Sequence, residues 1–391
     1  MPFAVLIFWK GGRAMRVFGV PLIERIKRID PILFGASFFL SVMSILTILG
    51  SVENFGRSKL VMQVALTVVG LVAVFLLANM DYKFFVDRFY IVLFLGSVAI
   101  LALTLLFGIS GINMETENRS WITIPGIGIS IQPSEFVKIT FLCTFSKHID
   151  MVRDKLNKPT VLAGLMAHAG AIVGLILLSG DLGVALVYMG IILIMLFCAG
   201  LSGWYFLGAG ALIAVAFPFL WDLLKPYQQK RIIYGFQPEL DPIGVGQQPL
   251  MSREVIARGG LFGKGLFEGG MYEDLTASHT DFIFATVCEK FGFVGGALVV
   301  VALIVLSIRL FYVGAKCREN MGRLICFGCA AMIIIQTLEN LWMCLALVPV
   351  VGITLPFMSA GGSSVLAIYV LMGLAHSVSA GEKKFYFRRE G

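Results

Sequence analysis

Long apolar runs alternate with short polar connections along almost the whole chain. A helix crosses a bilayer with roughly 20 apolar residues, and about ten runs approach that length. The predicted spans are residues 32–51, 60–80, 86–108, 133–149, 160–179, 181–200, 203–221, 281–313, 323–349 and 361–380. This pattern predicts an all-α polytopic membrane protein with about ten transmembrane helices, formed by one integral domain over residues 1–391.

One long polar segment, residues 222–280, interrupts this pattern and predicts a single large loop. It ends on His279-Thr280-Asp281-Phe282, where the next apolar run begins. A carboxylate held where a wet loop meets a dry helix can have a raised pKa and accept a proton. The sequence therefore predicts a chemical or binding site around Asp281.

Composition agrees with the membrane class and excludes other classes of function. Hydrophobic residues make up 58% of the chain and charged residues 14%, against about 25% charged residues in soluble domains. The net charge of +7 does not indicate nucleic-acid binding, because the basic residues lie in short loops. Cys326 and Cys329 have the spacing of a redox or metal pair, but they lie inside an apolar run without a nearby His, so we predict buried thiols and no metal site.

The distribution of Lys and Arg predicts the orientation. Residues 1–31 form a basic amphipathic arm typical of a cytoplasmic membrane surface. Basic residues crowd the loops on the same side as this arm, whereas the opposite short loops hold only Arg57, Lys59 and Arg119. The positive-inside rule then places both termini in the cytoplasm. It places residues 109–132, 179–181, 222–280 and 350–360 outside, and all the unusual motifs lie on that side.

Two charges inside the fourth run are the second candidate feature. Glu135 and Lys138 are three residues apart, so they share a helix face. Charges inside a membrane are usually functional, and we interpret them as part of a polar cavity in which Lys138 is available to an anion such as a diphosphate. The alternative is an ion pair that only fixes helix packing.

Other polar residues have two interpretations each. Trp121, beside Arg119, is either an interfacial residue or part of the site. Asp181 either caps the helix that follows it or takes part in chemistry. Arg231 lies in a basic stretch of the long loop.

Residues 349–364 contain two prolines and three glycines at the membrane edge and predict an irregular or re-entrant segment. Irregular backbone at membrane depth is tolerated only where protein or water covers it. The glycine run Gly259–Gly265 lacks the Lys-Ser/Thr of a P-loop, so nucleotide binding is not predicted.

Taken together and in this order, the motifs resemble the SEDS family of shape, elongation, division and sporulation proteins. The resemblance covers about residues 30–380. It is carried by Gln132-Pro133-Ser134-Glu135-x-x-Lys138, by His279-Thr280-Asp281-Phe282-Ile283-Phe284, and by Leu355-Pro356-Phe357 with Ser359-x-Gly361-Gly362-Ser363-Ser364.

The resemblance implies a peptidoglycan glycosyltransferase in the bacterial cytoplasmic membrane. Such an enzyme polymerises lipid II outside the membrane and works with a class B penicillin-binding protein, the transpeptidase. The family's essential acid falls on Asp281, and its paired Glu and Lys fall on Glu135 and Lys138. The matching motif residues His279, Thr280, Ser359, Gly361, Gly362 and Ser363 are the further candidates for substrate binding.

The chain departs from the family pattern at several places. Thr276 and Ala277 replace a Pro-Glu pair, Ser179-Gly180 replaces Gln-Pro or Glu-Pro, and Gln247, Arg258 and Ala360 replace a Tyr, a Ser and a Tyr. The basic arm, Asp241-Pro242 and Gly260–Gly265 resemble RodA more than FtsW.

The expected reaction needs one base and one anion site. We predict Asp281 as the base and Lys138, with Arg119 or Arg231, as the group that stabilises a departing diphosphate. A single base without a covalent nucleophile fits an inverting displacement. The sequence shows no evident cofactor site, and it leaves open whether the reaction needs a divalent cation. The rival hypotheses are a flippase for a lipid-linked precursor, a scaffold without activity, and a division or sporulation member of the same family.

Overall fold

The computed structural model describes residue 26 and residues 28–109, 119–123, 130–223 and 226–387. The basic arm predicted over residues 1–31 lies almost wholly outside this range. Within the described residues, every predicted span corresponds to a long helix. These helices are α2 (Pro31–Leu49), α4 (Arg57–Ala78), α5 (Tyr82–Phe107), α6 (Pro133–Val152), α7 (Pro159–Leu178), α8 (Leu182–Cys198), α9 (Gly203–Leu223), α12 (Ile283–Lys316), α13 (Asn320–Cys344) and α14 (Gly362–Phe387).

The helices confirm the predicted fold class. Among the described residues, seven helices are long and apolar enough to cross a membrane, and α8 and α9 contribute two shorter apolar helices. Helix α6 has the length of a span but carries Glu135 and Lys138. The chain is therefore an all-α integral membrane protein.

Local signals explain where the helices begin. The carboxylate of Asp30 accepts the backbone N–H groups of Ile32 and Leu33, which satisfies donors that the first turn of α2 leaves unpaired. Asp81 does the same for α5. Pro133 and Pro159 occupy the first positions of α6 and α7, where a missing N–H costs nothing.

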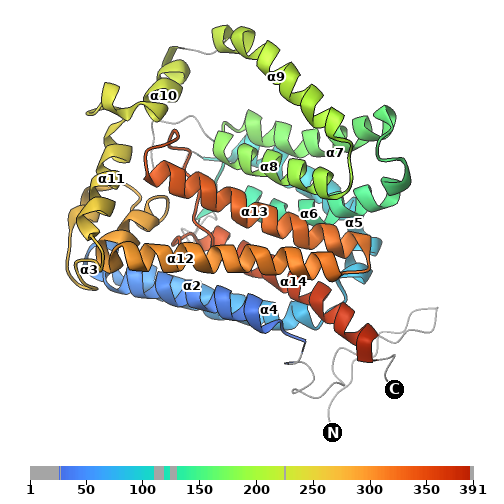
Figure 1. Ribbon diagram of the computed structural model, residues 1–391, viewed down its shortest axis with the longest axis horizontal. Coiled ribbons are helices and arrows are strands. Elements are labelled where there is room, and N and C mark those ends of the chain that lie inside the picture. Colours follow the sequence, from blue (N-terminus) through green and yellow to red (C-terminus); the bar gives the residue numbers. More distant parts are fainter. Residues whose placement is uncertain (1–25, 27, 110–118, 124–129, 224–225, 388–391) are drawn as a thin grey trace.

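The long helices lie side by side, and the large loop covers one end of the bundle (Figure 1). We call this the loop end, because it carries α10 (Pro226–Phe236) and α11 (Gln247–Gly259). The start of α2 and the end of α14 lie at the opposite end (Figure 1). Helix α14 packs closely on α4, and α12 packs on α13, α11 and α2.

The large loop is more ordered than the sequence predicted. Besides α10 and α11, it contains the short 3₁₀ helices η2 (Pro238–Leu240) and η3 (Met271–Asp274). Short elements also flank the bundle elsewhere: α3 (Val52–Phe55), η1 (Arg153–Lys155), and the antiparallel strands β1 (Ile122–Thr123) and β2 (Ser130–Ile131). The low apolar content of residues 222–280 had indicated only a polar connection.

Two helices differ from the predicted spans in ways that shape the loop end. Helix α13 ends at Cys344 and not at 349, because Ala346 adopts a left-handed conformation with φ of 56° that a right-handed helix cannot continue through. Helix α12 is broken at Gly292, where φ is 68° and ψ is −167°. Residues 345–361 have irregular backbone and overlap the irregular segment predicted over 349–364, whose last three residues instead begin α14. We call residues 345–361 the outer segment, after the side of the membrane on which we expect it; much of it is buried.

Candidate functional site

Asp281 lies in the last turn before α12, and its backbone is fixed on two sides. The Nδ2 atom of Asn340, a fully buried residue of α13, donates to the carbonyls of Asp281 and Ile353 at 2.7 Å each. The hydroxyl of Ser359 donates to the carbonyl of Thr280 at 2.7 Å. The peptide chain that carries Asp281 is therefore bonded both to α13 and to the outer segment.

The carboxylate of Asp281 has an unusual environment. Burial raises its pKa, a hydrogen bond with Thr280 lowers it by less, and the charge of Asp181 raises it further, to about 6. A Cβ atom placed on Gly352 would lie 3.5 Å from Oδ2 of Asp281, an ordinary van der Waals contact, so Gly352 of the outer segment lies beside this carboxylate. A carboxylate with this pKa is ionised at neutral pH and is a stronger base than an ordinary Asp.

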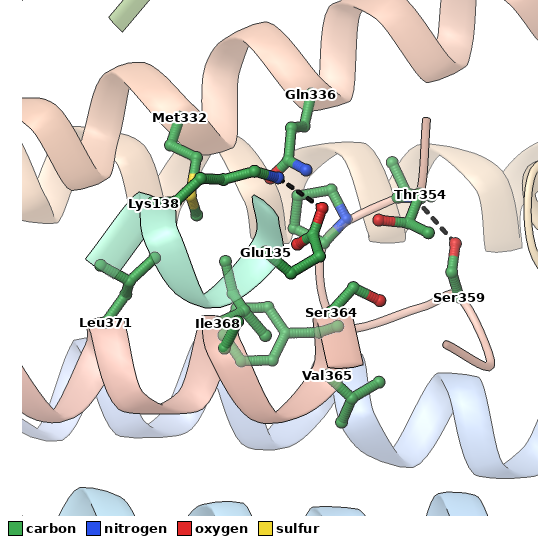
Figure 2. A pocket seen from close by; sticks show the side chains of 14 residues that line it. Glu135, Lys138, Met332, Gln336, Thr354, Ser359, Ser364, Val365, Ile368 and Leu371 are labelled. Carbon is green, nitrogen blue, oxygen red and sulfur yellow. Dashed lines mark hydrogen bonds and ion pairs between the residues drawn. The ribbon is translucent and has the colours of Figure 1, made fainter. Parts of the chain in front are cut away.

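Glu135 and Lys138 form an ion pair on α6 with 2.6 Å between Nζ and Oε1. Their side chains are 7% and 1% exposed. They line a small cavity between α6, α13, α14 and the outer segment (Figure 2). In this cavity the pair faces Gln336, Thr354, Ser359 and Ser364 among apolar neighbours. Ser359 therefore both lines the cavity of the ion pair and holds the backbone next to Asp281.

Asp181 joins these two parts. It caps α8, since its Oδ1 accepts the N–H of Val184 at 3.1 Å. Its Oδ2 accepts from the side chain of Gln132 at 3.0 Å, and the backbone N–H of Gln132 donates to the hydroxyl of Ser363 at 3.1 Å. Burial raises the pKa of Asp181, although these hydrogen bonds and the charge of Lys138 oppose the shift. Asp181 is thus a cap, and its charge also acts on both Asp281 and Lys138.

The remaining predicted residues lie at varying distances from this centre. His279 accepts a hydrogen bond from the N–H of Ala360 on its carbonyl. Gly361 ends the outer segment and Gly362 begins α14. The backbone N–H of Arg119 donates to the carbonyl of Ser179, but its side chain is exposed. Trp121 is half-buried and pairs through its backbone with Ile109. The side chain of Arg231 lies outside the described residues.

The sequence did not predict a role for three further residues near the site, which are Asn340, Lys59 and Glu289. Lys59 contacts the imidazole of His279. Burial and the charge of Lys59 together lower the pKa of His279 to about 4. Glu289 accepts the N–H groups of Gly270, Met271 and Tyr272 within 3.2 Å, which ties the last part of the loop to α12. Ionisable residues at the ends of apolar runs were the available signal, but Lys59 was interpreted only as a loop charge.

The arrangement provides a proton acceptor, Asp281, and a buried cation, Lys138, which are connected through Ser359 and through the charge of Asp181. Asp281 can take a proton, and Lys138 can bind an anion if its ammonium group donates to Glu135 and to the anion at the same time. Among the described residues, no three His, Cys, Asp or Glu side chains gather as a metal site. The site is therefore suited to acid–base and electrostatic catalysis at the loop end of a membrane bundle.

Comparison with known proteins places the chain in a family. The FtsW/RodA/SpoVE family, described as "Cell cycle protein", matches residues 28–384. "Probable peptidoglycan glycosyltransferase FtsW" of Trichlorobacter lovleyi is 32% identical over 358 residues, which are 90% of each chain. "Peptidoglycan glycosyltransferase MrdB" of Escherichia coli is 32% identical over 270 residues, which are 68% of this chain and 72% of that protein.

A solved structure has the same fold over most of the chain. "Structural coordination of polymerization and crosslinking by a peptidoglycan synthase complex" matches with a TM-score of 0.76 and 28% identity, covering 90% of this chain and 98% of the other. Since the match to the family extends over nearly all the described helices, the chain belongs to the FtsW, RodA and SpoVE family, which is the SEDS family that its motifs indicate.

Proposed function

We propose that this protein is a peptidoglycan glycosyltransferase that polymerises lipid II into β-1,4 glycan strands on the outer face of the bacterial cytoplasmic membrane. The observation that carries the proposal is the position of Asp281. Its pKa of about 6 suits a general base at neutral pH. Asn340 holds the carbonyl of Asp281, and Ser359 of the outer segment holds that of the preceding Thr280. Relatives over most of the chain are named peptidoglycan glycosyltransferases.

In the proposed reaction, Asp281 accepts the proton of an acceptor sugar hydroxyl while that oxygen attacks the anomeric carbon of the donor. The bond from this carbon to the diphosphate breaks, and the polyprenyl diphosphate leaves with the electron pair. Attack from the face opposite the leaving group inverts an α-linked donor to a β-linked product. Lys138 stabilises the negative charge that develops on the diphosphate.

The bound substrate would change the balance of charge at Lys138. In the structure its ammonium group donates to Glu135 at 2.6 Å, and Asp181 lies near enough to interact with it. A diphosphate adds negative charge to a region that already holds several carboxylates. The ammonium group has three donors, so it can bind a phosphate oxygen without leaving Glu135.

The wider setting of the enzyme is also part of the proposal. Both termini are cytoplasmic, the loop end faces outward, and a class B penicillin-binding protein is the partner. The peptidoglycan synthase complex that shares this fold is described as coordinating polymerization and crosslinking, which supports such a partner. We favour a role in elongation over division or sporulation. Complementation would contradict this role if it restored septation but not rod shape.

The decisive experiment separates a polymerase from a flippase. Protein purified in detergent has no membrane sidedness, so translocation leaves no product, whereas a polymerase still joins lipid II into glycan. We expect polymer from the detergent-solubilised protein, in larger amounts with its transpeptidase partner. In proteoliposomes, labelled lipid II should not become accessible in the opposite leaflet at a rate set by the protein. Protein-dependent flipping without polymer, with the correct partner present, would replace the proposal.

The orientation has an independent test. Six of the seven cysteines are buried and only Cys198 is partly exposed, so a Cys198→Ser background is nearly unreactive. A cysteine at Glu254, exposed on α11, should react with a membrane-impermeant maleimide on intact cells. A cysteine at Lys155, exposed between α6 and α7, should react only after permeabilisation. The reverse labelling pattern would invert the topology.

A further inference from the structure

The glycine-rich turn of the large loop exposes large apolar side chains. In residues 259–267, which we call the apolar turn, Leu261, Phe262 and Phe267 are 58%, 77% and 72% exposed. Soluble surfaces seldom gather such residues without a partner. The glycines of this turn have no role in the proposed reaction, so both the glycines and the exposed side chains need an explanation.

The apolar turn is bonded to the break in α12. The N–H groups of Phe293 and Val294 donate to the carbonyls of Gly260 and Leu261 at 2.9 and 3.1 Å. The N–H of Lys264 donates to the carbonyl of Glu289 at 2.8 Å. These bonds use backbone groups that the break at Gly292 would otherwise leave unpaired, so the turn and the break form one structure.

Glycines make this close contact feasible. Gly292 and Gly263 have φ values of 68° and 85°, which favour glycine. A Cβ atom on Gly292 would collide with the backbone of Leu261 and Gly263, and one on Gly263 would collide with Lys290. The glycines therefore allow the apolar turn to pack directly against the backbone of α12.

Two contacts between the antiparallel helices α2 and α12 indicate how deep the apolar turn lies relative to the membrane. At one end Arg309 binds Asp30 at 2.7 Å. At the other end Lys290 donates to the carbonyl of Gly50 at 2.8 Å, and to that of Leu266 in the apolar turn at 3.0 Å. The 19 residues of α2 span about 28 Å, close to the roughly 30 Å of a bilayer core. Gly50, Lys290 and Leu266 therefore lie at the boundary of the bilayer core on the loop end.

The exposed surface of the turn continues onto the surface of α12 that faces lipid. Phe293, the first residue after the break, is 68% exposed, and Leu298 further along the span is 49% exposed. Phe293 is bonded to Gly260, so the exposed residues of the turn adjoin those of the span. Lys264 is exposed in the same turn and can reach lipid head groups.

We propose that the apolar turn inserts into the outer leaflet of the membrane, with Leu261, Phe262 and Phe267 among the upper acyl chains and Lys264 at the head groups. Glu289, bonded to Lys264, also holds residues 270–272, from which the chain continues to Asp281. The turn thus fixes the height of the catalytic loop relative to the lipid surface. The proposal rests on the orientation proposed above but not on the activity.

Depth-dependent fluorescence quenching tests this insertion without any activity assay. In the Cys198→Ser background, a cysteine at Phe262 or at Phe267 is labelled with an environment-sensitive fluorophore. The labelled protein is reconstituted alone into phosphatidylcholine–phosphatidylglycerol vesicles. Glu254→Cys, exposed and polar on α11, is the matched control. We expect blue-shifted emission at both turn positions, and quenching by lipid doxyl-labelled near the head group at least twofold stronger than at Glu254.

Other outcomes overturn the proposal. Emission and quenching equal to those of Glu254 at both positions would mean that the turn lies in water. A blue shift that arises only when a class B penicillin-binding protein is added to the vesicles would make the turn a protein interface. Because the two cysteine positions are read separately, misfolding of one variant, detected by loss of its monodisperse elution, leaves the other as the test.

Discussion

Asp281→Asn should lower polymerisation by about 10²–10⁴-fold, the range that a positioned general base contributes. The amide has nearly the same shape as the carboxyl group but cannot accept the proton of the sugar hydroxyl. The backbone contacts of residue 281 to Asn340 and Cys344 use its carbonyl and do not depend on the side chain. Folding should therefore be unchanged while turnover is lost.

The measurement is glycan formed from lipid II by equal amounts of monodisperse purified protein. Asp274→Asn is a suitable control, since Asp274 is an exposed acid of the same loop and its variant should retain normal turnover. Near-normal turnover by Asp281→Asn would contradict the assignment of the base.

The pH dependence gives the same prediction a second readout. Burial raises the pKa of Asp281 to about 6, and only the ionised carboxylate can act as a base. Activity should therefore be full above this pKa and fall about tenfold for each pH unit below it. The residual activity of Asp281→Asn should lack this transition. An unchanged rate of the wild-type protein between pH 7 and pH 5 would mean that the essential group is not this carboxylate.

The sequence predicted the membrane part of the fold because the bilayer constrains the length and composition of each span separately. A spanning segment must be apolar over a fixed length and must satisfy its own backbone. Each predicted run therefore became a helix, even α6 with its two charges. The same local logic gave a cap as one of the two interpretations of Asp181, and it placed Pro133 at the start of the fourth span.

The positions of helix ends at the loop end were harder to predict. Leu345, Leu347 and Val348 are apolar, so residues 345–349 extended the ninth run in the sequence. The structure ends α13 at Cys344, because Ala346 turns into the left-handed region. This break is compensated by tertiary bonds, such as the one from Asn340 to Ile353, and these bonds have no signature in hydropathy.

Contacts between distant parts of the chain were likewise beyond sequence reasoning. Asn340 follows Glu339 in a mostly apolar run, and nothing nearby indicates that it bonds to Asp281, 59 residues away. Glu289 and Lys290 were hidden inside the eighth run, although charges at a span end are a usable signal. Helices α10 and α11 have too few apolar residues for hydropathy to predict them. They cover the loop end of the bundle and do not span the membrane.

Glu135 and Lys138 provide the second large effect, because their roles in folding and in chemistry can be separated. Removing one partner leaves a buried charge uncompensated, which costs about 3–5 kcal/mol. Removing both charges avoids this cost. We therefore expect Glu135→Gln and Lys138→Met to unfold at lower temperature as single variants, and the double variant to recover most of the lost stability. Thermal unfolding in detergent measures this recovery.

The double variant Glu135→Gln/Lys138→Met should be folded and nevertheless inactive, with turnover reduced by at least about 10²-fold, because the diphosphate loses the cation that stabilises its developing charge.

The pair of Asp87 and Lys147 serves as the control. It has the same 2.6 Å separation and also involves α6, but it is more exposed, with side chains 39% and 20% exposed. Asp87→Asn/Lys147→Met should change stability by no more than about 1 kcal/mol and leave turnover intact. If the Glu135/Lys138 double variant polymerises lipid II at the normal rate, the pair only fixes helix packing, and the cation that binds the diphosphate must be sought elsewhere, first at Lys59 beside His279.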